Sequence, residues 1–391
     1  MADNFKMLAK TLFGLEPILA KELRNLGAIK VTEGVRNVTF YGDTGFMYKA
    51  NLALRTAIRI LKPYKTFRVR DEHDLYREIQ KIHWEQFLFH DKTFAVNSTI
   101  SSDNFTNSHY VSLKTKDAIV DYFRDKYNER PSIDLDYPDL HINIHIINND
   151  CTISFDSSGQ SLHKRGYKTG TNIAPINEVL AAGMILLSGY DGTTHFMDPM
   201  CGSGTILIEA AMIALNIPAN INRKEFAFEN WEDFDADLFE KIQDSLMKKV
   251  RETSYKIIGF DKAPSVIQKA NDNIENASLS EFIKIERQDF FDSEKPFDDM
   301  KTIMIFNPPY GERLKVDVKR FYSRIGDTLK QNYPNTDAWL ITSDVENGIK
   351  NVGLKTSRRI QLFNGKLECK YVKYEMYSGS KRTKFQVKSE E

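Results

Sequence analysis

The chain has 391 residues, more than a single hydrophobic core usually organises, so we expect two or three domains. Its 54 Lys and Arg residues balance its 54 Asp and Glu residues, so a nucleic-acid surface would have to be a local patch. The scattered cysteines, Cys151, Cys201 and Cys369, predict free thiols and no structural metal. No signal-peptide pattern opens the chain and no apolar run reaches about 18 residues, which predicts a cytoplasmic protein.

The first 158 residues mix short strands and helices, a pattern typical of α+β units. In residues 1–60 we expect a strand around 7–13, a helix over 14–27 ended by Gly27, strands within 31–42 and a helix over 44–60. In residues 61–158 we expect helices over 75–88 and 113–127, a strand over 92–101, and a hairpin that turns at residues 148–150.

From His195 onward, apolar strands alternate with helices, which indicates a parallel sheet wrapped by helices. We place the main boundary near residues 159–161 and the α/β domain over 159–380. It begins with a basic loop and a helix that Pro175 could start and Gly189 could end. The acidic, aromatic insertion 216–252 is expected to pack over the sheet edge, and residues 381–391 to form a flexible tail.

A glycine turn joins the first strand of this domain to its helix. Asp198 ends the strand, and Gly202 and Gly204 turn the backbone so that its amides can face a polar ligand. Asp261 and Asp289, after the next two strands, could accept hydrogen bonds from a ribose and an adenine amino group. The alternative is a tight strand-to-helix connection with no ligand, and the long gap before Asp261 disfavours a nicotinamide enzyme.

Asn307, Pro308, Pro309 and Tyr310 follow the fourth strand. Two prolines can simply end a strand, but the carboxyl edge of an open α/β sheet is where ligands bind. The Asn307 side-chain oxygen and the Pro308 carbonyl can accept hydrogen bonds from a planar exocyclic amine, and Tyr310 could stack on its base. Such a base must leave its helical stack, so these residues favour a single-stranded or flipped substrate.

The sequence DPMCGSGT followed by NPPYGER resembles class I S-adenosylmethionine-dependent methyltransferases that modify exocyclic amines. Together with LHKRGY, APINEVLAAGMI and LFNGKLECKYVKYEMY, it is similar to the THUMP-containing ribosomal RNA large subunit methyltransferase L group over essentially the whole chain. The resemblance implies a ferredoxin-like segment over 1–60, a THUMP RNA-binding domain over 61–158 and a Rossmann-like methyltransferase domain. It also implies methyl transfer to the N2 of a guanine in 23S rRNA.

The same resemblance implies roles for individual residues. Asn307, Pro308, Pro309 and Tyr310 would form the catalytic clamp. The S-adenosylmethionine site would be formed by Asp198, Met200, Gly202, Gly204, Asp261, Asp289 and Phe290. Some members of this group carry a second methyltransferase domain after the first. This sequence shows only the first, so we expect it to perform only the guanine-N2 reaction.

Basic residues gather at the junction between the two halves, which favours contact with RNA phosphates, although a solvated loop would look the same. The residues expected to bind RNA are His163, Lys164, Arg165, Lys168, Arg313 and, by stacking, Tyr167. Arg313 could instead pair with Glu312. No histidine spacing indicates a metal, and His109, His141 and His145 are expected to be structural.

Three other functions remain open on the sequence alone. The same clamp could serve a tRNA guanine, or an adenine N6 in DNA or a glutamine amide in protein, because each presents a planar amine. A binding module that has lost catalysis is the third possibility, which the complete glycine and NPPY segments disfavour. The α+β half and the basic junction favour RNA, and rRNA before tRNA, as the partner.

Overall fold

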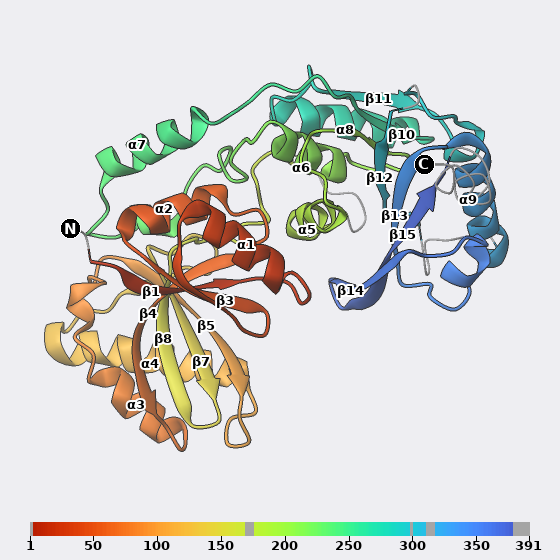
Figure 1. The fold of residues 1–391 in the computed structure, drawn as a ribbon. Coiled ribbons are helices and arrows are strands. Elements are labelled where there is room, and N and C mark those ends of the chain that lie inside the picture. Colours follow the sequence, from red (N-terminus) through yellow and green to blue (C-terminus); the bar gives the residue numbers. More distant parts are fainter. Residues whose placement is uncertain (1–2, 169–175, 298–299, 310–316, 378–391) are drawn as a thin grey trace. The chain divides into compact units, whose positions relative to one another are not determined.

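The computed structural model describes residues 3–168, 176–297, 300–309 and 317–377, and the chain divides into two compact units (Figure 1). The first unit contains Met1–Thr11, Leu19–Lys164 and Arg223–Ser245. The second contains Leu12–Ile18, Arg165–Asn222 and Leu246–Glu391. The chain therefore enters each unit more than once, which the predicted linear succession of domains did not anticipate.

The first unit is built on an eight-stranded sheet with the order β2-β3-β1-β4-β8-β7-β5-β6. Most neighbours are antiparallel, and β5 runs parallel to both β6 and β7. Its strands are β1 (Phe5–Lys10), β2 (Ile29–Glu33), β3 (Asn37–Gly42), β4 (Arg59–Arg68), β5 (Thr93–Ser101), β6 (Ser132–Ile133), β7 (Leu140–Ile147) and β8 (Asp150–Asp156). Asn148, at φ 52°, occupies the predicted hairpin turn between β7 and β8.

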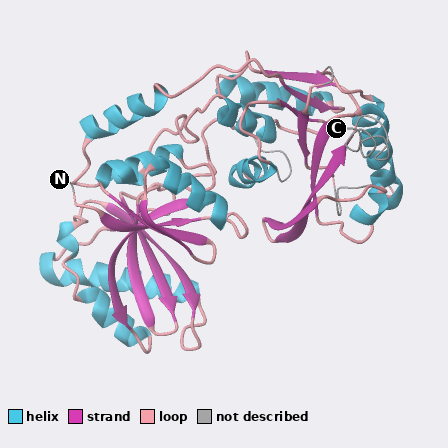
Figure 2. Ribbon diagram, viewed as in Figure 1, coloured by secondary structure: helices cyan, strands magenta, loops and turns pink. Residues whose placement is uncertain are grey.

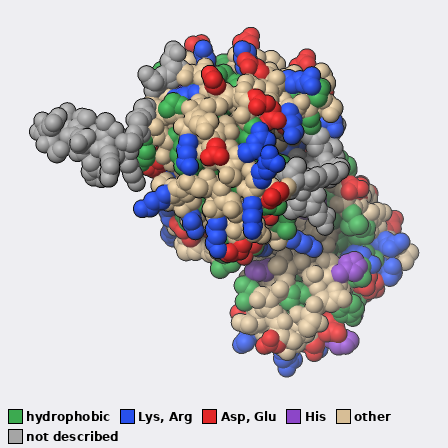
Figure 3. All heavy atoms as spheres, turned by 90° about the vertical axis from the view of Figure 1, so that its right-hand side faces the viewer, with side chains coloured by type: hydrophobic (Ala, Val, Ile, Leu, Met, Phe, Trp, Pro, Cys, Tyr) green, Lys and Arg blue, Asp and Glu red, His purple; other side chains and the backbone are tan. Residues whose placement is uncertain are grey.

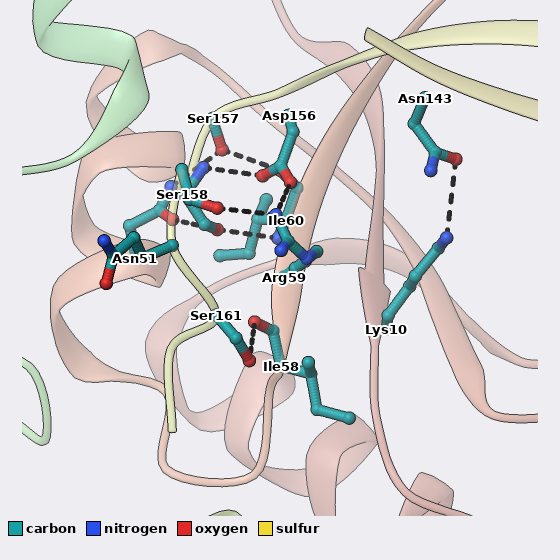
Figure 4. Close-up of polar contacts among 12 residues, drawn as sticks. Lys10, Asn51, Ile58, Arg59, Ile60, Asn143, Asp156, Ser157, Ser158 and Ser161 are labelled. Atoms are coloured by element: carbon teal, nitrogen blue, oxygen red, sulfur yellow. Dashed lines mark hydrogen bonds and ion pairs between the residues drawn. The ribbon is translucent and has the colours of Figure 1, made fainter. Parts of the chain in front are cut away.

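Strand β4 joins the two parts of the first unit into one sheet, because it pairs with β1 on one side and β8 on the other. The predicted boundary at residue 60 falls inside this strand. Figure 4 shows the polar contacts that fix the join: Arg59 pairs with Asp156, and the Ser157 hydroxyl donates to the Ile60 carbonyl at 2.8 Å. The Asn51 side chain donates to the Ser157 hydroxyl at 2.9 Å and so ties a helix to the same corner.

Helices α1 (Glu16–Leu26), α2 (Thr44–Ala53), α3 (Glu72–Gln80) and α4 (Ser108–Tyr127) belong largely to this unit. The predicted helix over 44–60 is wrong in its second half, because α2 ends at Ala53. The Arg55 and Thr56 amides donate to the Glu22 carboxylate at 2.9 and 3.1 Å, so a side chain takes the donors that another helical turn would use. Residue 59 then begins β4.

The middle of the insertion packs within the first unit, while residues 216–222 and 246–252 belong to the second. The expectation that the insertion covers the edge of the α/β sheet is corrected for this middle part. Residues 223–245 belong to the first unit, and Tyr48 of α2 stacks on Phe228 at 4.5 Å between ring centroids. Phe234 and Phe239 both meet the Tyr48 ring at 5.7 Å. Aromatic burial against α2, which sequence composition cannot locate, decides where this segment lies.

The second unit is built on a seven-stranded sheet with the order β11-β10-β9-β12-β13-β15-β14 (Figure 2). Strands β9 to β13 run parallel to one another, β15 is antiparallel to β13, and β14 is antiparallel to β15. Its strands are β9 (His195–Asp198), β10 (Ile257–Asp261), β11 (Ile283–Arg287), β12 (Thr302–Phe306), β13 (Thr336–Thr342), β14 (Arg358–Asn364) and β15 (Leu367–Met376).

Helices wrap this sheet as the alternating pattern predicts, and the Rossmann-like fold class is confirmed. They are α5 (Glu178–Ser188), α6 (Thr205–Ala214), α8 (Pro264–Asn276) and α9 (Val318–Asn332), while α7 (Ala236–Met247) lies in the insertion. Gly189, at φ +84°, ends α5 as predicted, and the structure does not describe Pro175 or the predicted tail. Strand order reverses at β9, with β10 on one side and β12 on the other, and such switch points are where doubly wound sheets bind ligands.

Candidate active site at the strand-order switch

A cavity of about 600 Å³ lies at the carboxyl ends of β9, β10 and β12. It brings together most of the predicted cofactor and catalytic residues. Those that line it are Asp198, Met200, Gly202, Asp261, Asp289, Phe290, Asn307, Pro308 and Pro309. Four separate segments, 198–202, 261, 289–290 and 307–309, therefore meet at one edge of the sheet, as their positions after successive parallel strands predict.

The glycine turn between β9 and α6 lines the cavity. Gly202 and Gly204 have φ values of +54° and +80°, a region that L side chains rarely adopt, so both positions favour glycine. The Gly202 amide donates to the Asp261 carboxylate at 3.1 Å, and the Cys201 amide donates to the Phe260 carbonyl at 2.8 Å. These bonds tie the turn to β10, and α6 then starts with no side-chain cap over its first amides.

Two carboxylates on neighbouring strand ends are held by backbone amides. Asp261 accepts from the Gly202 amide and, through its other oxygen, from the Ala263 amide at 3.0 Å. Asp289 caps a short 3-10 turn by accepting from the Phe291 amide at 3.1 Å. Each oxygen of an ionised carboxylate can accept more than one hydrogen bond, so both side chains keep capacity for hydroxyl or amino donors of a ligand.

Asp198 is nearly fully buried, at 1% exposure, and accepts from the Met200 amide at 3.1 Å. Burial raises the pKa of this carboxyl well above its usual range, and the nearby Asp261 carboxylate adds to the rise. The folded protein therefore holds a proton at Asp198 at pH values where the unfolded chain has released it. Above the unfolded pKa of 3.8, this group makes the protein less stable as pH rises towards the folded value.

Replacement of Asp198 by asparagine is therefore expected to stabilise the cofactor-free protein at high pH. The amide keeps an acceptor for the Met200 N–H but cannot ionise, which removes the burial cost of a charge. We expect a stabilisation that grows as pH rises above the unfolded pKa of 3.8, and therefore a flatter stability profile over that range. Urea unfolding at several pH values measures this, and a profile parallel to that of the wild type would contradict the expectation.

The segment after β12, predicted to be catalytic, contains a hydrogen-bond acceptor that has no partner among the described residues. The Asn307 Oδ1 atom is buried and has no hydrogen-bond partner among the described residues, while Asn307, Pro308 and Pro309 all line the cavity. A buried amide oxygen without a partner carries a free-energy penalty that an amine donor of a substrate would remove. The predicted residues Tyr310 and Arg313 lie outside the described part of the chain.

Two of the predicted RNA-binding residues are core residues, and their assignment to RNA is corrected. Arg165 is 1% exposed, and its guanidinium contacts the Glu209 carboxylate at 3.3 Å and the Asn220 side-chain oxygen at 3.0 Å. Tyr167 is fully buried and donates to the same Glu209 oxygen at 3.2 Å. Neither side chain can reach a phosphate or a base while these contacts hold.

The other junction residues are divided between the surface and the cavity wall. Lys164 is exposed, and His163 is half-buried with its Nδ1 atom 2.8 Å from the Ser161 hydroxyl. Lys168 pairs with Glu178 at 2.8 Å and also lies 3.4 Å from the carbonyl of Ile176, which lines the cavity. Lys168 is therefore bound to the wall of the cavity rather than free for RNA.

Several cavity residues escaped the sequence prediction. The cavity is also lined by residues that were not predicted: Ile176, Thr205, Phe291 and Phe321. Next to Phe291, only Phe290 was predicted to bind the cofactor, and its side chain is 2% exposed and part of the core. Phe321 stands on a helix at apolar spacing, which indicates core packing as readily as a ligand site. The only signal for Phe291 in the sequence was its place two residues after Asp289.

Within the described residues, no group of three or more His, Cys, Asp or Glu side chains could hold a metal ion. No helix among them is both long enough and apolar enough to cross a bilayer. His141 and His145 lie on β7, His109 lies on α4, and the three cysteines are buried with free thiols.

Comparison with known proteins matches three families along the chain. Residues 6–61 match the RlmL ferredoxin-like domain, residues 69–156 the THUMP domain, and residues 165–373 the RMKL-like methyltransferase domain. A Synechocystis protein named as a candidate RNA methyltransferase, slr0064, is 38% identical over 93% of this chain and 95% of its own length. A ribosomal RNA large subunit methyltransferase K/L from Syntrophotalea carbinolica is 33% identical over 96% of this chain.

This chain spans about half of that K/L relative, 54% of its length. Among solved structures, SMU.472, a candidate methyltransferase in complex with SAH, superposes with a TM-score of 0.84 at 30% identity and covers 97% of this chain and all of its own. A Listeria monocytogenes protein named as an N6-adenine-specific DNA methylase superposes at 0.83 with 28% identity, covering 96% of this chain and 97% of its own. The chain therefore belongs to the RMKL-like methyltransferases, with an RlmL ferredoxin-like domain and a THUMP domain preceding the methyltransferase domain.

Proposed function

We propose that this protein transfers a methyl group from S-adenosylmethionine to the exocyclic N2 of a guanine in RNA, with 23S rRNA as the substrate. The observation that carries the proposal is the unpartnered Asn307 Oδ1, buried beside the glycine turn in a cavity of about 600 Å³. This acceptor suits an exocyclic amine, and the THUMP domain and the RNA-methyltransferase relatives favour RNA.

The cavity residues fit S-adenosylmethionine. Met200, Gly202 and Ser203 of the glycine turn line the cavity, and Asp261 and Asp289 retain acceptor capacity for ribose hydroxyls and an adenine amine. The related SMU.472 was crystallised with SAH. Phe291, Phe321 and Ile176 supply apolar surface for a ring. When bound, S-adenosylmethionine supplies an electrophilic methyl group.

The protein's contribution to the reaction is to place and orient the amine. Asn307 Oδ1 and the Pro308 carbonyl would each accept one N–H of the guanine amine, which turns the nitrogen lone pair towards the methyl donor. Neither acceptor needs to titrate. Because burial leaves Asn307 Oδ1 without water or protein partners in the described residues, this bond replaces an unmet one and so favours a bound amine.

The proposal is tested by methyl transfer from labelled S-adenosylmethionine to unmodified 23S rRNA, tRNA, duplex DNA and bulk protein, followed by mass spectrometry of the nucleosides. We expect N2-methylguanosine in 23S rRNA. Label in tRNA alone would correct the substrate, and N6-methyladenine in DNA would favour the activity named for the Listeria relative. Cofactor binding without transfer to any of these substrates would indicate a binding module.

A further inference from the structure

We propose that the exposed face of α9 binds the phosphates that flank the target nucleotide, with Arg320 and Arg324 as the central contacts. This inference rests on the proposed RNA substrate and adds to it a contact surface. It also replaces the junction residues Arg165 and Tyr167, which the structure buries.

Helix α9 reaches the cavity through its first turn. Phe321 lines the cavity from α9, and its ring meets the Phe291 ring edge-on, with centroids 5.4 Å apart and an interplanar angle of 87°. Phe291 itself lines the cavity from the segment after Asp289. Through Phe321, and through Arg324 against Phe291, the first half of α9 therefore lies next to the wall of the cavity.

Arg324 is anchored beside this wall by its contact with an aromatic ring. Its guanidinium carbon lies 4.0 Å from the centroid of the Phe291 ring, a close cation–π contact. Arg324 is nevertheless exposed. A guanidinium that contacts a ring through its face keeps its in-plane N–H donors for other acceptors, and these donors match the geometry of a phosphate.

The exposed face of α9 carries more positive than negative charge. Its exposed cations are Lys319, Arg320, Arg324 and Lys330, and its exposed acids are Asp317 and Asp327, which gives a net charge of +2 from four cations and two anions. None of the four cations forms an ion pair with another described residue, whereas the whole chain is neutral. Figure 3 turns the side of the molecule on which Figure 1 labels α9 towards the viewer and shows Lys and Arg side chains in blue, with Asp and Glu side chains in red between them.

The spacing of the two arginines also favours a ligand over a structural role. Arg320 and Arg324 are four residues apart, so they are neighbours on one helix face, where like charges repel and weaken the helix. A polyanion that lies across both removes this repulsion. RNA fits better than an acidic protein because a base that enters the cavity necessarily brings its own flanking phosphates to the rim.

The test is the salt dependence of binding to a fluorescein-labelled single-stranded RNA of mixed sequence, followed by anisotropy. Each phosphate contact on a single strand contributes about 0.7 to the slope of log K against log salt concentration. We expect Arg320→Gln/Arg324→Gln to lower this slope by about 1.4, and Arg320→Gln alone to lower it by about 0.7. The control Arg359→Gln removes another exposed arginine, on the edge strand β14, and is expected to leave the slope unchanged.

The outcomes separate this inference from the proposed function. If wild-type protein methylates RNA but the double variant keeps the wild-type salt slope, the α9 surface is wrong and the activity stands. A wild-type protein that neither binds nor methylates RNA overturns both. Calorimetry with S-adenosylmethionine reports whether loss of Arg324 disturbs the cavity through Phe291. If it does, the salt slope of Arg320→Gln decides the question, because Arg320 makes no cation–π contact with a described residue. Equal loss of slope in Arg359→Gln would also overturn the assignment, because it would show a diffuse charge effect.

Discussion

Replacement of Asn307 by alanine is expected to lower the rate of methyl transfer by about 10²–10³-fold and to leave the affinity for S-adenosylmethionine within about twofold of the wild type. The side chain supplies one acceptor, Oδ1, which is buried at the cavity and has no partner among the described residues. Its removal deprives the amine of orientation but leaves the glycine turn, Asp261 and Asp289 in place. Single-turnover methylation and calorimetric titration measure the two quantities separately.

A matched variant sharpens this prediction. Asn307→Asp keeps an acceptor oxygen of the same reach, so it is expected to retain more activity than Asn307→Ala. Both substitutions lie outside the glycine turn, and a parallel thermal melt checks that the fold is intact. A loss of cofactor affinity that equals the loss of rate in Asn307→Ala would assign Asn307 to the cofactor and overturn its role as an amine acceptor.

Replacement of Arg165 by methionine is expected to destabilise the protein by about 3–5 kcal/mol, because it leaves the buried Glu209 carboxylate without its charged partner. The side chains of Arg165 and Glu209 are 1% and 0% exposed, and the pair is 3.3 Å apart. The Glu209 Oε2 atom already has no partner among the described residues, so the protein has little means to compensate the loss. Urea unfolding, followed by circular dichroism, measures the change.

The neighbouring residue provides the control for this experiment. Lys164 is exposed, so Lys164→Met is expected to change the unfolding free energy by no more than about 0.5 kcal/mol. The double variant Arg165→Met/Glu209→Leu replaces both buried charges with apolar groups and is expected to recover part of the stability. If Arg165→Met is as stable as the wild type and yet binds RNA with a lower salt slope, Arg165 belongs to the RNA surface after all.

Much of the catalytic domain could be predicted from the sequence because its signals are local. The run of residues from Asp198 to Gly204 contains both the end of β9 and the turn into α6, and Asn307 to Pro309 follow β12 directly. Successive parallel strands end at the same sheet edge, so motifs at their carboxyl ends must converge. Asp198, Asp261, Asp289 and Asn307 accordingly line one cavity, whereas Gly204 is not among its lining residues.

The division of the chain into compact parts was less accessible, because it depends on pairings between distant residues. Strand β4 follows α2, whose predicted range runs past its observed end at Ala53 and into the strand. Only the pairing of β4 with both β1 and β8 shows that one sheet runs through residues 5–156. The aromatic insertion packs on Tyr48, and the Asp235 amide donates a hydrogen bond to the Tyr48 hydroxyl. These two residues are 187 positions apart in the sequence. Composition identifies such a segment as apolar without indicating its partner.

By itself, the sequence determined the strand and helix alternation of the second half, the glycine turn and the strand-end clamp, because each depends on neighbouring residues and on the fixed geometry of parallel strands. Tertiary structure alone decided which charged and aromatic side chains reach solvent. Arg165 and Tyr167 meet Glu209 across 44 and 42 positions and are buried, while Arg324 meets Phe291 and stays exposed. The sequence around an arginine or a tyrosine does not show whether its side chain is buried or exposed. Its role depends on what lies beside it in the fold, a buried carboxylate or an aromatic ring near the surface.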